Sequence, residues 1–452
     1  MSGTATPDSD DGSEPAHPSP LRHNRDFRRF FAGQFVTNAG DSLYSVAVLW
    51  LVFELSGSTA LTGVANSLLL LPYLLQIVAG PVVDRLSVKR VLVGAQVGQG
   101  VVVLVFPLAA AAGFLRVELI LATVPVLALL TLLTAPVPTT LVPRLVAEDQ
   151  LSRANSALAT ISLGLDMVFD ALGGAFIAVF GATALFVLDS ATFAVATVLF
   201  AGMTVPTVEG PAGTGDETGA SGETERPVRS ALREYADDLR DGIDVLRGTV
   251  FVETLFTSAV FNFAVGVTLA ILPAFGQLRG GPAVYGALLG ALGIGRLVGS
   301  LAATRLEGVP YGRLKAGSYL AAACCWLGAV SAPSTGVTVG LFGLAWVAAG
   351  ASAVLVQTVN QRVFSAGLLG RVAAIKGTAS TATLPVGSLV GGVVADQVGV
   401  VTTMGLAALG FGFAGCYFAV RPRLRNLPAV ADADPSDFGV DTDAPPADHG
   451  EE

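Results

Sequence analysis

Charged residues are scarce in this sequence: they make up 13% of the chain, whereas apolar residues make up 52%. An ordinary soluble domain carries about 25% charged residues. Of the 35 acidic residues, 22 lie in three polar segments, residues 1–20, 206–249 and 426–452. The rest of the 452-residue chain is therefore poorer still in charge. This composition excludes a soluble globular protein and predicts an integral membrane protein.

Side chains that commonly carry catalysis or bind metals are also few. The three histidines lie outside the apolar runs, and the spacing of the three cysteines fits no metal site. None of the three lysines follows a glycine, so the Gly-Lys-Ser/Thr loop of ATP-binding proteins is missing. We therefore expect no enzyme activity, no cofactor, no metal and no nucleic-acid partner. An energy source, where one is needed, would be an ion gradient of protons or sodium.

Apolar runs long enough to cross a bilayer, about 17–25 residues each, occur twelve times. The fold class predicted is all-α and integral to the membrane, with twelve transmembrane helices. The first six cover residues 30–53, 61–83, 91–112, 117–141, 157–180 and 182–203. The second six cover residues 251–275, 284–304, 316–332, 337–358, 372–395 and 400–420.

Basic residues indicate the orientation of these spans. With the N-terminus inside, 23 of the 26 lysines and arginines fall in the segments on the inner side. Cytoplasmic loops carry such an excess of positive charge. The first twenty residues lack the basic start and apolar core of a cleavable signal peptide, so the first span would direct insertion. We expect a multi-pass protein of the cytoplasmic membrane, monomeric, with both termini in the cytoplasm.

Composition shifts divide the chain into five parts. Two halves of six spans are joined by a polar linker, whose positions 230–246 have the apolar periodicity of an amphipathic helix. The two acidic ends are predicted to be disordered. The parts are an N-terminal tail (1–28), the N-terminal half (29–205), the linker (206–249), the C-terminal half (250–421) and a C-terminal tail (422–452).

The two halves are an internal repeat. An ungapped offset of 218 residues aligns Thr140, Arg144, Gly173, Gly174 and Gly181 with Thr358, Arg362, Gly391, Gly392 and Gly399. The fifth span is therefore the counterpart of the eleventh. Repeated halves with a binding site between them are a known transporter architecture.

The segment after the second span reads Gly80-Pro-Val-Val-Asp84-Arg85-Leu-Ser-Val-Lys89-Arg90. It resembles motif A of the major facilitator superfamily, in which a glycine, Asp-Arg and a basic cluster follow one another. Ser87 and Val88 depart from the family's usual residues. The resemblance implies two pseudo-symmetric six-helix halves. It also implies a cytoplasmic gate, in which Asp84 lies against the start of the eleventh span in the outward-open state, where a helix N-terminus attracts a carboxylate.

Several short stretches are similar to the branch of that superfamily that contains macrolide-efflux and enterobactin-export proteins: Gly40-Asp41, Trp50-Leu-Val, Leu151-Ser-Arg-Ala-Asn155, Asp189 through Phe193, and Gly370-Arg371-Val372. The resemblance covers about residues 25–422. It implies a protein that exports a small amphipathic drug, secondary metabolite or siderophore-like compound. We expect secondary active transport by alternating access, with protons as the coupling ion and sodium as the alternative. Uptake, lipid flipping by the same fold, and a sensor that binds without flux are the alternatives.

Charged residues within the spans are the candidate functional groups. Arg296 lies in the eighth span, roughly 14 Å from its inner end at 1.5 Å per residue, and Asp166 lies at a similar depth in the fifth. Because these spans pack together in the family fold, we expect an inter-half ion pair, either structural or broken during transport; an arrangement without contact is the third alternative. Asp41 and Asp170 are the candidates for ion coupling, since a buried carboxyl can bind a proton near neutral pH. Asp189 lies closer to the outer face, where a structural role is favoured.

Small and aromatic residues complete the predicted site. The glycine pairs Gly173-Gly174 and Gly391-Gly392 would allow close packing of helices. Drug–proton antiporters often have Gly-Pro before the first of these pairs, where this sequence has Phe169 and Asp170. Tyr44, Phe169 and Asn262 are candidates for cargo contact; the alternative is a lipid-facing position for the two aromatic residues and a packing hydrogen bond for Asn262.

Overall fold

The computed structural model describes residues 21, 23–72, 87–204, 246–364, 372, 375–377 and 379–440, without the side chains of residues 162, 163, 165 and 166. Every regular element in these ranges is helical. The first half contains α1 (Arg25–Ser56), α2 (Thr59–Leu69), α4 (Val88–Ala111), α5 (Val117–Thr134), α6 (Val137–Leu145), η1 (Glu148–Gln150), α7 (Leu151–Phe180) and α8 (Ala182–Ala201). The second contains α10 (Val250–Arg279), α11 (Pro282–Leu306), α12 (Tyr311–Ser331), α13 (Thr335–Val363), α15 (Thr383–Val398) and α16 (Val400–Val420).

Nine helices in the described ranges are long and apolar enough to cross a membrane. The predicted second span, 61–83, runs into residues 73–83, and the predicted eleventh span, 372–395, includes residues 373, 374 and 378; all of these lie outside the described part. The number twelve therefore stays a prediction. Residues 1–20, the linker up to residue 245 and its expected amphipathic helix also lie outside the described part.

Local sequence signals set the ends of several helices. Asn24, Ser58 and Thr249 precede α1, α2 and α10, and each side chain accepts a hydrogen bond from a backbone N–H of the first turn. Gly181 and Gly399 join α7 to α8 and α15 to α16 with positive φ angles of 80° and 91°. These two glycines are partners in the internal repeat, so corresponding helix pairs of the two halves have the same tight connection.

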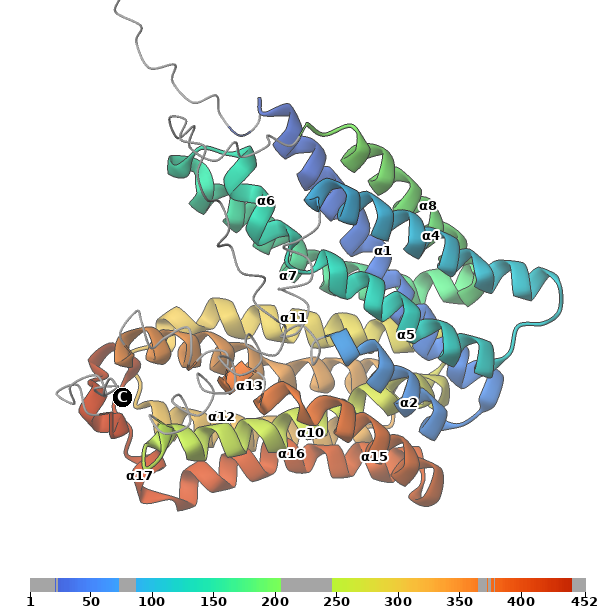
Figure 1. Ribbon diagram of the computed structural model, residues 1–452. Coiled ribbons are helices and arrows are strands. Elements are labelled where there is room, and N and C mark those ends of the chain that lie inside the picture. The colour runs from blue at the N-terminus through green and yellow to red at the C-terminus, as the bar shows by residue number, and fades with distance from the viewer. Residues whose placement is uncertain are drawn as a thin grey trace, which may run out of the picture.

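The helices form two groups, drawn above and below in Figure 1. Helix α2 is the exception, because it belongs to the first half in sequence and packs on α15 and α10 of the second. The two groups diverge toward the end of the molecule that carries the start of α1 and the end of α16 (Figure 1). We call this the basic end, because Arg25, Arg144, Arg305 and Arg421 lie there, and we call the opposite one the far end.

The segment after α16 differs from the disordered tail that we expected from residue 422 onward. Residues 422–440 form α17 (Pro422–Arg425), η2 (Val430–Asp432) and η3 (Pro435–Phe438). Phe438 is buried and stacks on Phe251 at a ring-centroid distance of 5.5 Å. Arg362 donates hydrogen bonds to the carbonyl oxygens of Val430 and Ala431. The apolar residues among the acidic ones hold the segment on the second half, and residues 441–452 lie outside the described part.

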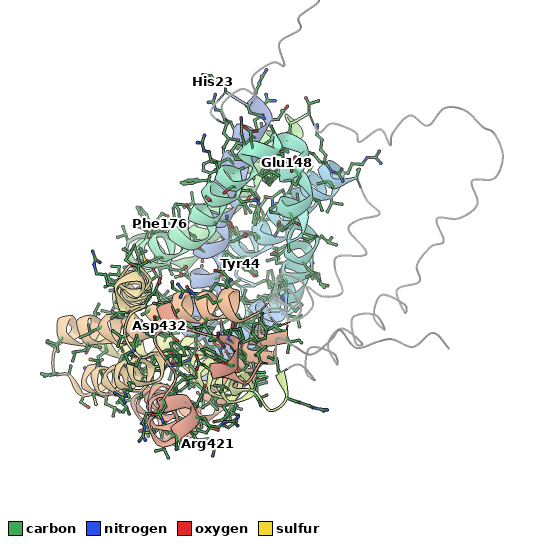
Figure 2. The ribbon with its side chains drawn as sticks, turned by 90° about the vertical axis from the view of Figure 1, so that its left-hand side faces the viewer. His23, Tyr44, Glu148, Phe176, Arg421 and Asp432 are labelled. Atoms are coloured by element: carbon green, nitrogen blue, oxygen red, sulfur yellow. The ribbon has the colours of Figure 1, made fainter. Side chains whose placement is uncertain are left out.

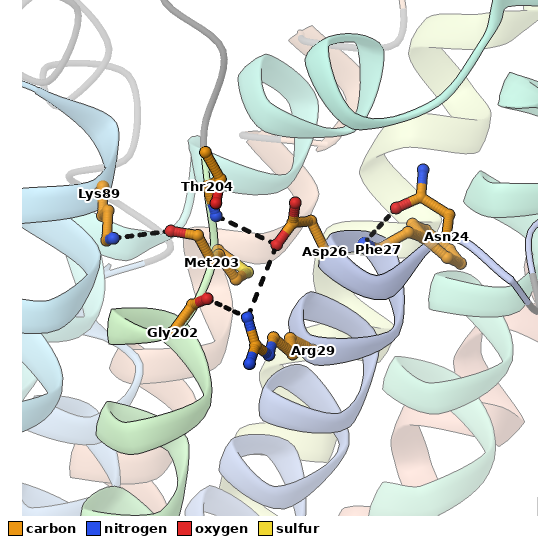
Figure 3. Close-up of polar contacts among 8 residues, drawn as sticks. All are labelled: Asn24, Asp26, Phe27, Arg29, Lys89, Gly202, Met203 and Thr204. Atoms are coloured by element: carbon orange, nitrogen blue, oxygen red, sulfur yellow. Dashed lines mark hydrogen bonds and ion pairs between the residues drawn. The ribbon is translucent and has the colours of Figure 1, made fainter.

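The last residues of the predicted N-terminal tail are also helical, where we expected disorder. Helix α1 begins at Arg25, inside the range 1–28 that we assigned to a tail. Figure 3 shows the polar contacts that hold this end: the carboxylate of Asp26 accepts a hydrogen bond from the backbone N–H of Thr204 at 3.0 Å, and Arg29 donates to the carbonyl oxygen of Gly202. These contacts join the start of α1 to the end of α8.

Candidate functional site

The two halves are in close contact where α7 crosses α11. A Cβ atom at Gly174 would overlap with the backbone of Gly286, and a Cβ atom at Gly290 would lie 2.8 Å from the Cβ of Ala171. Real side chains do not tolerate these separations, so the backbones can approach only because the residues are glycine. The fifth and eighth predicted spans therefore pack together, as the family resemblance implied.

The second junction joins α2 to α15 near the far end. The carboxylate of Asp396 accepts hydrogen bonds from the hydroxyl of Ser58 at 2.7 Å and from the hydroxyl and backbone N–H of Thr59 at 2.6 and 2.8 Å. Deeper in the bundle, the Asn66 amide donates to the hydroxyl of Ser388 at 2.7 Å. These bonds place an anion at the N-terminus of α2, where the helix dipole favours it.

Glycines of the repeat lie at both junctions. A Cβ atom added to Gly173 would lie 3.1 Å from a methyl carbon of Val46 on α1. Gly391 packs in the same way on Val267 of α10. A Cβ at Gly392 would overlap with the carbonyl oxygen of Thr59. The same small residues therefore bring α7 and α15, the counterparts in the two halves, into contact with their neighbours.

Two adjoining cavities lie between these junctions and the basic end. The first, of about 620 Å³, is lined mainly by the first half, and the second, of about 540 Å³, mainly by the second half. We call them the N cavity and the C cavity. Both are within the range of about 300–1,000 Å³ that is usual for small-molecule sites. They share a boundary of five residues, Leu70, Val265, Leu269, Arg296 and Trp346.

The N cavity carries the acidic candidates. Asp41 of α1 and Asp170 of α7 are half-buried on its wall, and Arg296 lies on the wall that it shares with the C cavity. Tyr44 also lines it and is 8% exposed, with its ring edge-on to Phe186 at 6.0 Å. Figure 2 shows Tyr44 in the part of the first half that adjoins the second. The structure therefore brings one predicted cargo residue and both coupling candidates to one wall.

Asp189 of α8 lies behind that wall. Its side chain is fully buried, with Oδ1 accepting a hydrogen bond from the Thr192 hydroxyl at 3.2 Å and Oδ2 without a partner among the described residues. A Cβ at Gly40, the residue before Asp41, would overlap with this carboxyl group. The structural role that the sequence favours for Asp189 stays a prediction. Its Oδ2 is unsatisfied among the described residues, whereas buried polar atoms normally have partners.

The C cavity also contains a buried cation on its wall. Lys315 directly precedes the predicted ninth span, 316–332, and so counts in sequence among the basic residues of the inner segments; in the structure it lies on α12, is 6% exposed and lines the cavity. Asn262 of α10 lines the same cavity, as predicted cargo contacts should. The rarity of lysine in the chain was the only sequence signal for Lys315.

Other predicted site residues lie away from the cavities or outside the described part. Phe169 packs on Phe35 of α1 in an edge-on contact at 6.3 Å. The expected Asp166–Arg296 pair stays a prediction, because the side chain of Asp166 is not among those described. Of the expected gate, Gly80, Asp84 and Arg85 lie outside the described residues.

Two basic residues of the gate motif are described at the start of α4. Lys89 donates a hydrogen bond to the carbonyl oxygen of Met203 at 2.6 Å, which joins α4 to the end of α8 (Figure 3). Arg90 is exposed on the same turn. Within the described ranges, no group of histidine, cysteine and acidic residues has the arrangement of a metal site.

Comparison with known proteins supports a transporter fold. A bacterial homologue of the human lysosomal transporter Spinster, in an inward-facing and occupied conformation, aligns with a TM-score of 0.66 and 12% identity over 90% of this chain and 98% of its own. The nucleoside transporter NupG gives 0.59 and 12% over 87% and 98%. A bacterial homologue of the iron transporter ferroportin, in an inward-facing state, gives 0.60 and 17% over 88% and 99%.

The sequence itself identifies the family. A search among curated proteins finds no match. The family model described as transmembrane secretion effector matches residues 16–443, which is nearly the whole chain. With the all-helical structure and its transporter neighbours, this match confirms the superfamily and the all-helical membrane fold predicted from the sequence. The chain belongs to the transmembrane secretion effector family of the major facilitator superfamily of membrane transporters.

Proposed function

We propose that this protein exports a small amphipathic compound across the cytoplasmic membrane by alternating access and that the proton gradient drives the export. The observation that carries the proposal is the position of the two cavities. They adjoin at Arg296, with the carboxyl groups of Asp41 and Asp170 on the wall of one. Ionisable groups between transporter helices commonly mark the path of substrates and protons.

The expected orientation in the membrane supports cavities that open toward the cytoplasm. The excess of arginine and lysine in the segments at the basic end favours a cytoplasmic position for that end. The halves diverge there (Figure 1), while the contacts of Gly174 with Gly286 and of Asp396 with α2 join them toward the far end. In this orientation, cargo enters the cavities from the cytoplasm. Because one chain lines both cavities, a monomer suffices.

Coupling to protons follows from the carboxyl groups. A carboxyl group on a partly buried wall can alternate between an ionised and a protonated form as it is exposed to the two sides of the membrane. Asp41 and Asp170 would bind protons from outside and release them inside while cargo moves outward. In the opposite conformation, the gate formed by Asp84, Arg85 and the basic residues after them would close the cytoplasmic side.

Cellular accumulation of a panel of dyes and antibiotics tests the function. We expect cells that express the protein to accumulate less of at least one compound, and we expect this difference to disappear when the proton gradient is collapsed. Expression of the variant in which both Asp41 and Asp170 are replaced by asparagine is the matched control. Higher accumulation would indicate uptake, and transfer of a labelled lipid between leaflets would indicate a flippase. Binding without flux would indicate a sensor, and each of these three results would contradict export.

A further inference from the structure

The wall of the C cavity has an unbalanced charge. Lys315 and Arg296 both line it, and its described lining contains no aspartate or glutamate. The acidic residues that face the cavities, Asp41 and Asp170, lie on the wall of the N cavity. Negative and positive groups are therefore separated between the two cavities, and Arg296 lies on their common boundary.

Lys315 is the more deeply buried cation. Its Nζ lies 4.7 Å from the ring centroid of Phe418 and 5.7 Å from those of Tyr311 and Tyr319, and its hydrogen bond to the Tyr311 hydroxyl is long, at 3.4 Å. In the described part of the chain, no carboxylate forms an ion pair with it. Aromatic faces attract a cation, although they replace only part of the hydration that burial removes. Within the described ranges, the ammonium group therefore has no anion to balance its charge.

A structural role explains this arrangement poorly. A lysine that only covers apolar surface extends its ammonium group toward water. Lys315 is instead enclosed by aromatic rings and lines the cavity, with 6% of its surface exposed. An apolar side chain of the same length would fill the space among these rings without the cost of burying a charge.

The rest of the C cavity fits an amphipathic ligand. Phe261, Tyr319 and Trp346 form an aromatic wall, and Asn262 and Ser352 offer neutral hydrogen-bonding groups. Apolar walls with a few placed polar groups are typical of small-molecule sites. A ligand with an apolar ring system could lie on the aromatic wall with an acidic group directed toward Lys315.

We infer that the transported compound carries an anionic group, such as a carboxylate, sulfonate or phosphate, and that Lys315 binds this group in the C cavity. Arg296, on the boundary with the N cavity, would guide the same anion between the cavities. This inference rests on the proposed function in one respect, because it assumes that cargo binds in the C cavity. It specifies the class of cargo that the export assay should include.

Binding to the purified full-length protein tests the inference without transport. The probes are 2-naphthoate and its neutral amide, 2-naphthamide, which have the same ring system and differ in charge. In a neutral detergent, we expect naphthoate to bind roughly tenfold more tightly than naphthamide, as measured by tryptophan fluorescence and by the rise in unfolding midpoint. Lys315→Met should lose this preference and leave naphthamide binding unchanged, whereas Lys315→Arg should keep it.

Two further variants make the test specific. Arg423→Met removes an exposed cation of α17 that does not line the C cavity, and this variant should bind naphthoate like the wild type. If Lys315→Met fails to fold, Ser352→Asp places a carboxylate on the same cavity wall and should weaken the binding of naphthoate alone. Equal affinity for the two probes, or an unchanged preference in Lys315→Met or in Ser352→Asp, would overturn the inference. So would stabilisation through Lys315 by phosphatidylglycerol and not by naphthoate, because the anion would then belong to the bilayer.

Flux measurements separate this inference from the exporter proposal. Charge-selective binding through Lys315 without movement of any probe in vesicles would contradict export and support the anion site. Export of neutral compounds alone, at an unchanged rate in Lys315→Met, would contradict the anion site and support export.

Discussion

Asp396, at the far end of α15, accepts a hydrogen bond of 2.8 Å from the backbone N–H of Thr59, which lies 337 positions earlier in the chain. The same carboxylate also accepts the hydroxyl hydrogen bonds of Ser58 and Thr59. One side chain of the second half thus caps the first turn of a helix from the first half. Any movement that separates α2 from α15 at this end must break these bonds.

Replacing Asp396 with alanine should shift the protein away from the conformation in which the far end is joined. A hydrogen bond to a charged group contributes about 1.5–3 kcal/mol, so the loss of even one of these bonds should change the ratio of conformations by roughly tenfold or more. Spin labels at Phe114 and Val337, exposed residues near the far end of the two halves, would report it by electron–electron distance measurements in a cysteine-free background. We expect a new, longer distance.

Asp396→Asn keeps an acceptor oxygen and loses the charge, so its distance distribution should lie between those of the wild type and the alanine variant. Asp434→Ala removes an exposed carboxylate of the C-terminal segment and serves as the control. Identical distributions for the wild type and Asp396→Ala would show that these bonds do not hold the far end.

Replacing Gly174 with alanine should destabilise the junction of α7 and α11. The added Cβ would overlap with the backbone of Gly286, so the helices must separate. Overpacking of this kind costs about 1–3 kcal/mol, and we expect a lower unfolding midpoint of the purified protein. Gly164→Ala is the matched control, because the same helix offers open space at that position. Equal midpoints for the two variants would argue against a tight junction.

Asp170→Asn should uncouple transport from the proton gradient. The amide cannot exchange a proton near neutral pH, so we expect loss of accumulation against a gradient in inverted vesicles, while exchange of labelled for unlabelled cargo continues. Glu118→Gln, at the start of α5, is the control for loss of one negative charge. Loss of both accumulation and exchange would assign Asp170 to cargo binding or folding.

The predicted pair of Asp166 and Arg296 can be tested by exchanging the charges. If the pair joins the halves, either single alanine variant should lose activity. The double variant that combines Asp166→Arg with Arg296→Asp should recover much of it, because the two charges are then present in exchanged positions. The readout is export in the dye assay. A double variant no more active than the single ones would contradict the pair.

Truncation after Arg425 should destabilise the second half. It removes Phe438 and the carbonyl groups that accept the Arg362 hydrogen bonds, and it exposes the ring of Phe251. Loss of a buried phenylalanine costs about 3–5 kcal/mol, so we expect a clear fall in the unfolding midpoint. Truncation after Val440 leaves these contacts in place and should keep the wild-type midpoint. Equal midpoints for the two truncations would show that the segment adds no stability.

Much of the architecture could be predicted from the sequence alone. Apolar runs give helices in a bilayer because every backbone polar group must be satisfied within the segment. The repeat that relates Gly181 to Gly399 reappears as two equivalent helix connections, since a positive φ angle is a local property of glycine. The resemblance to the major facilitator superfamily depended on contiguous motifs, which are also local features of the sequence, and the family match confirms it.

The contents of the cavities depended on the tertiary structure. Lys315 reads as a loop residue in sequence, and only the rings of Phe418, Tyr311 and Tyr319, from two different helices, make it a buried cation. The bond between Asp396 and Thr59 joins distant parts of the chain, and no local pattern indicates it. Neighbouring residues were sufficient to predict most of the membrane helices and the family, because apolar runs and contiguous motifs are local patterns. The tertiary structure decided which charges face a cavity, because burial depends on residues that are far apart in the chain.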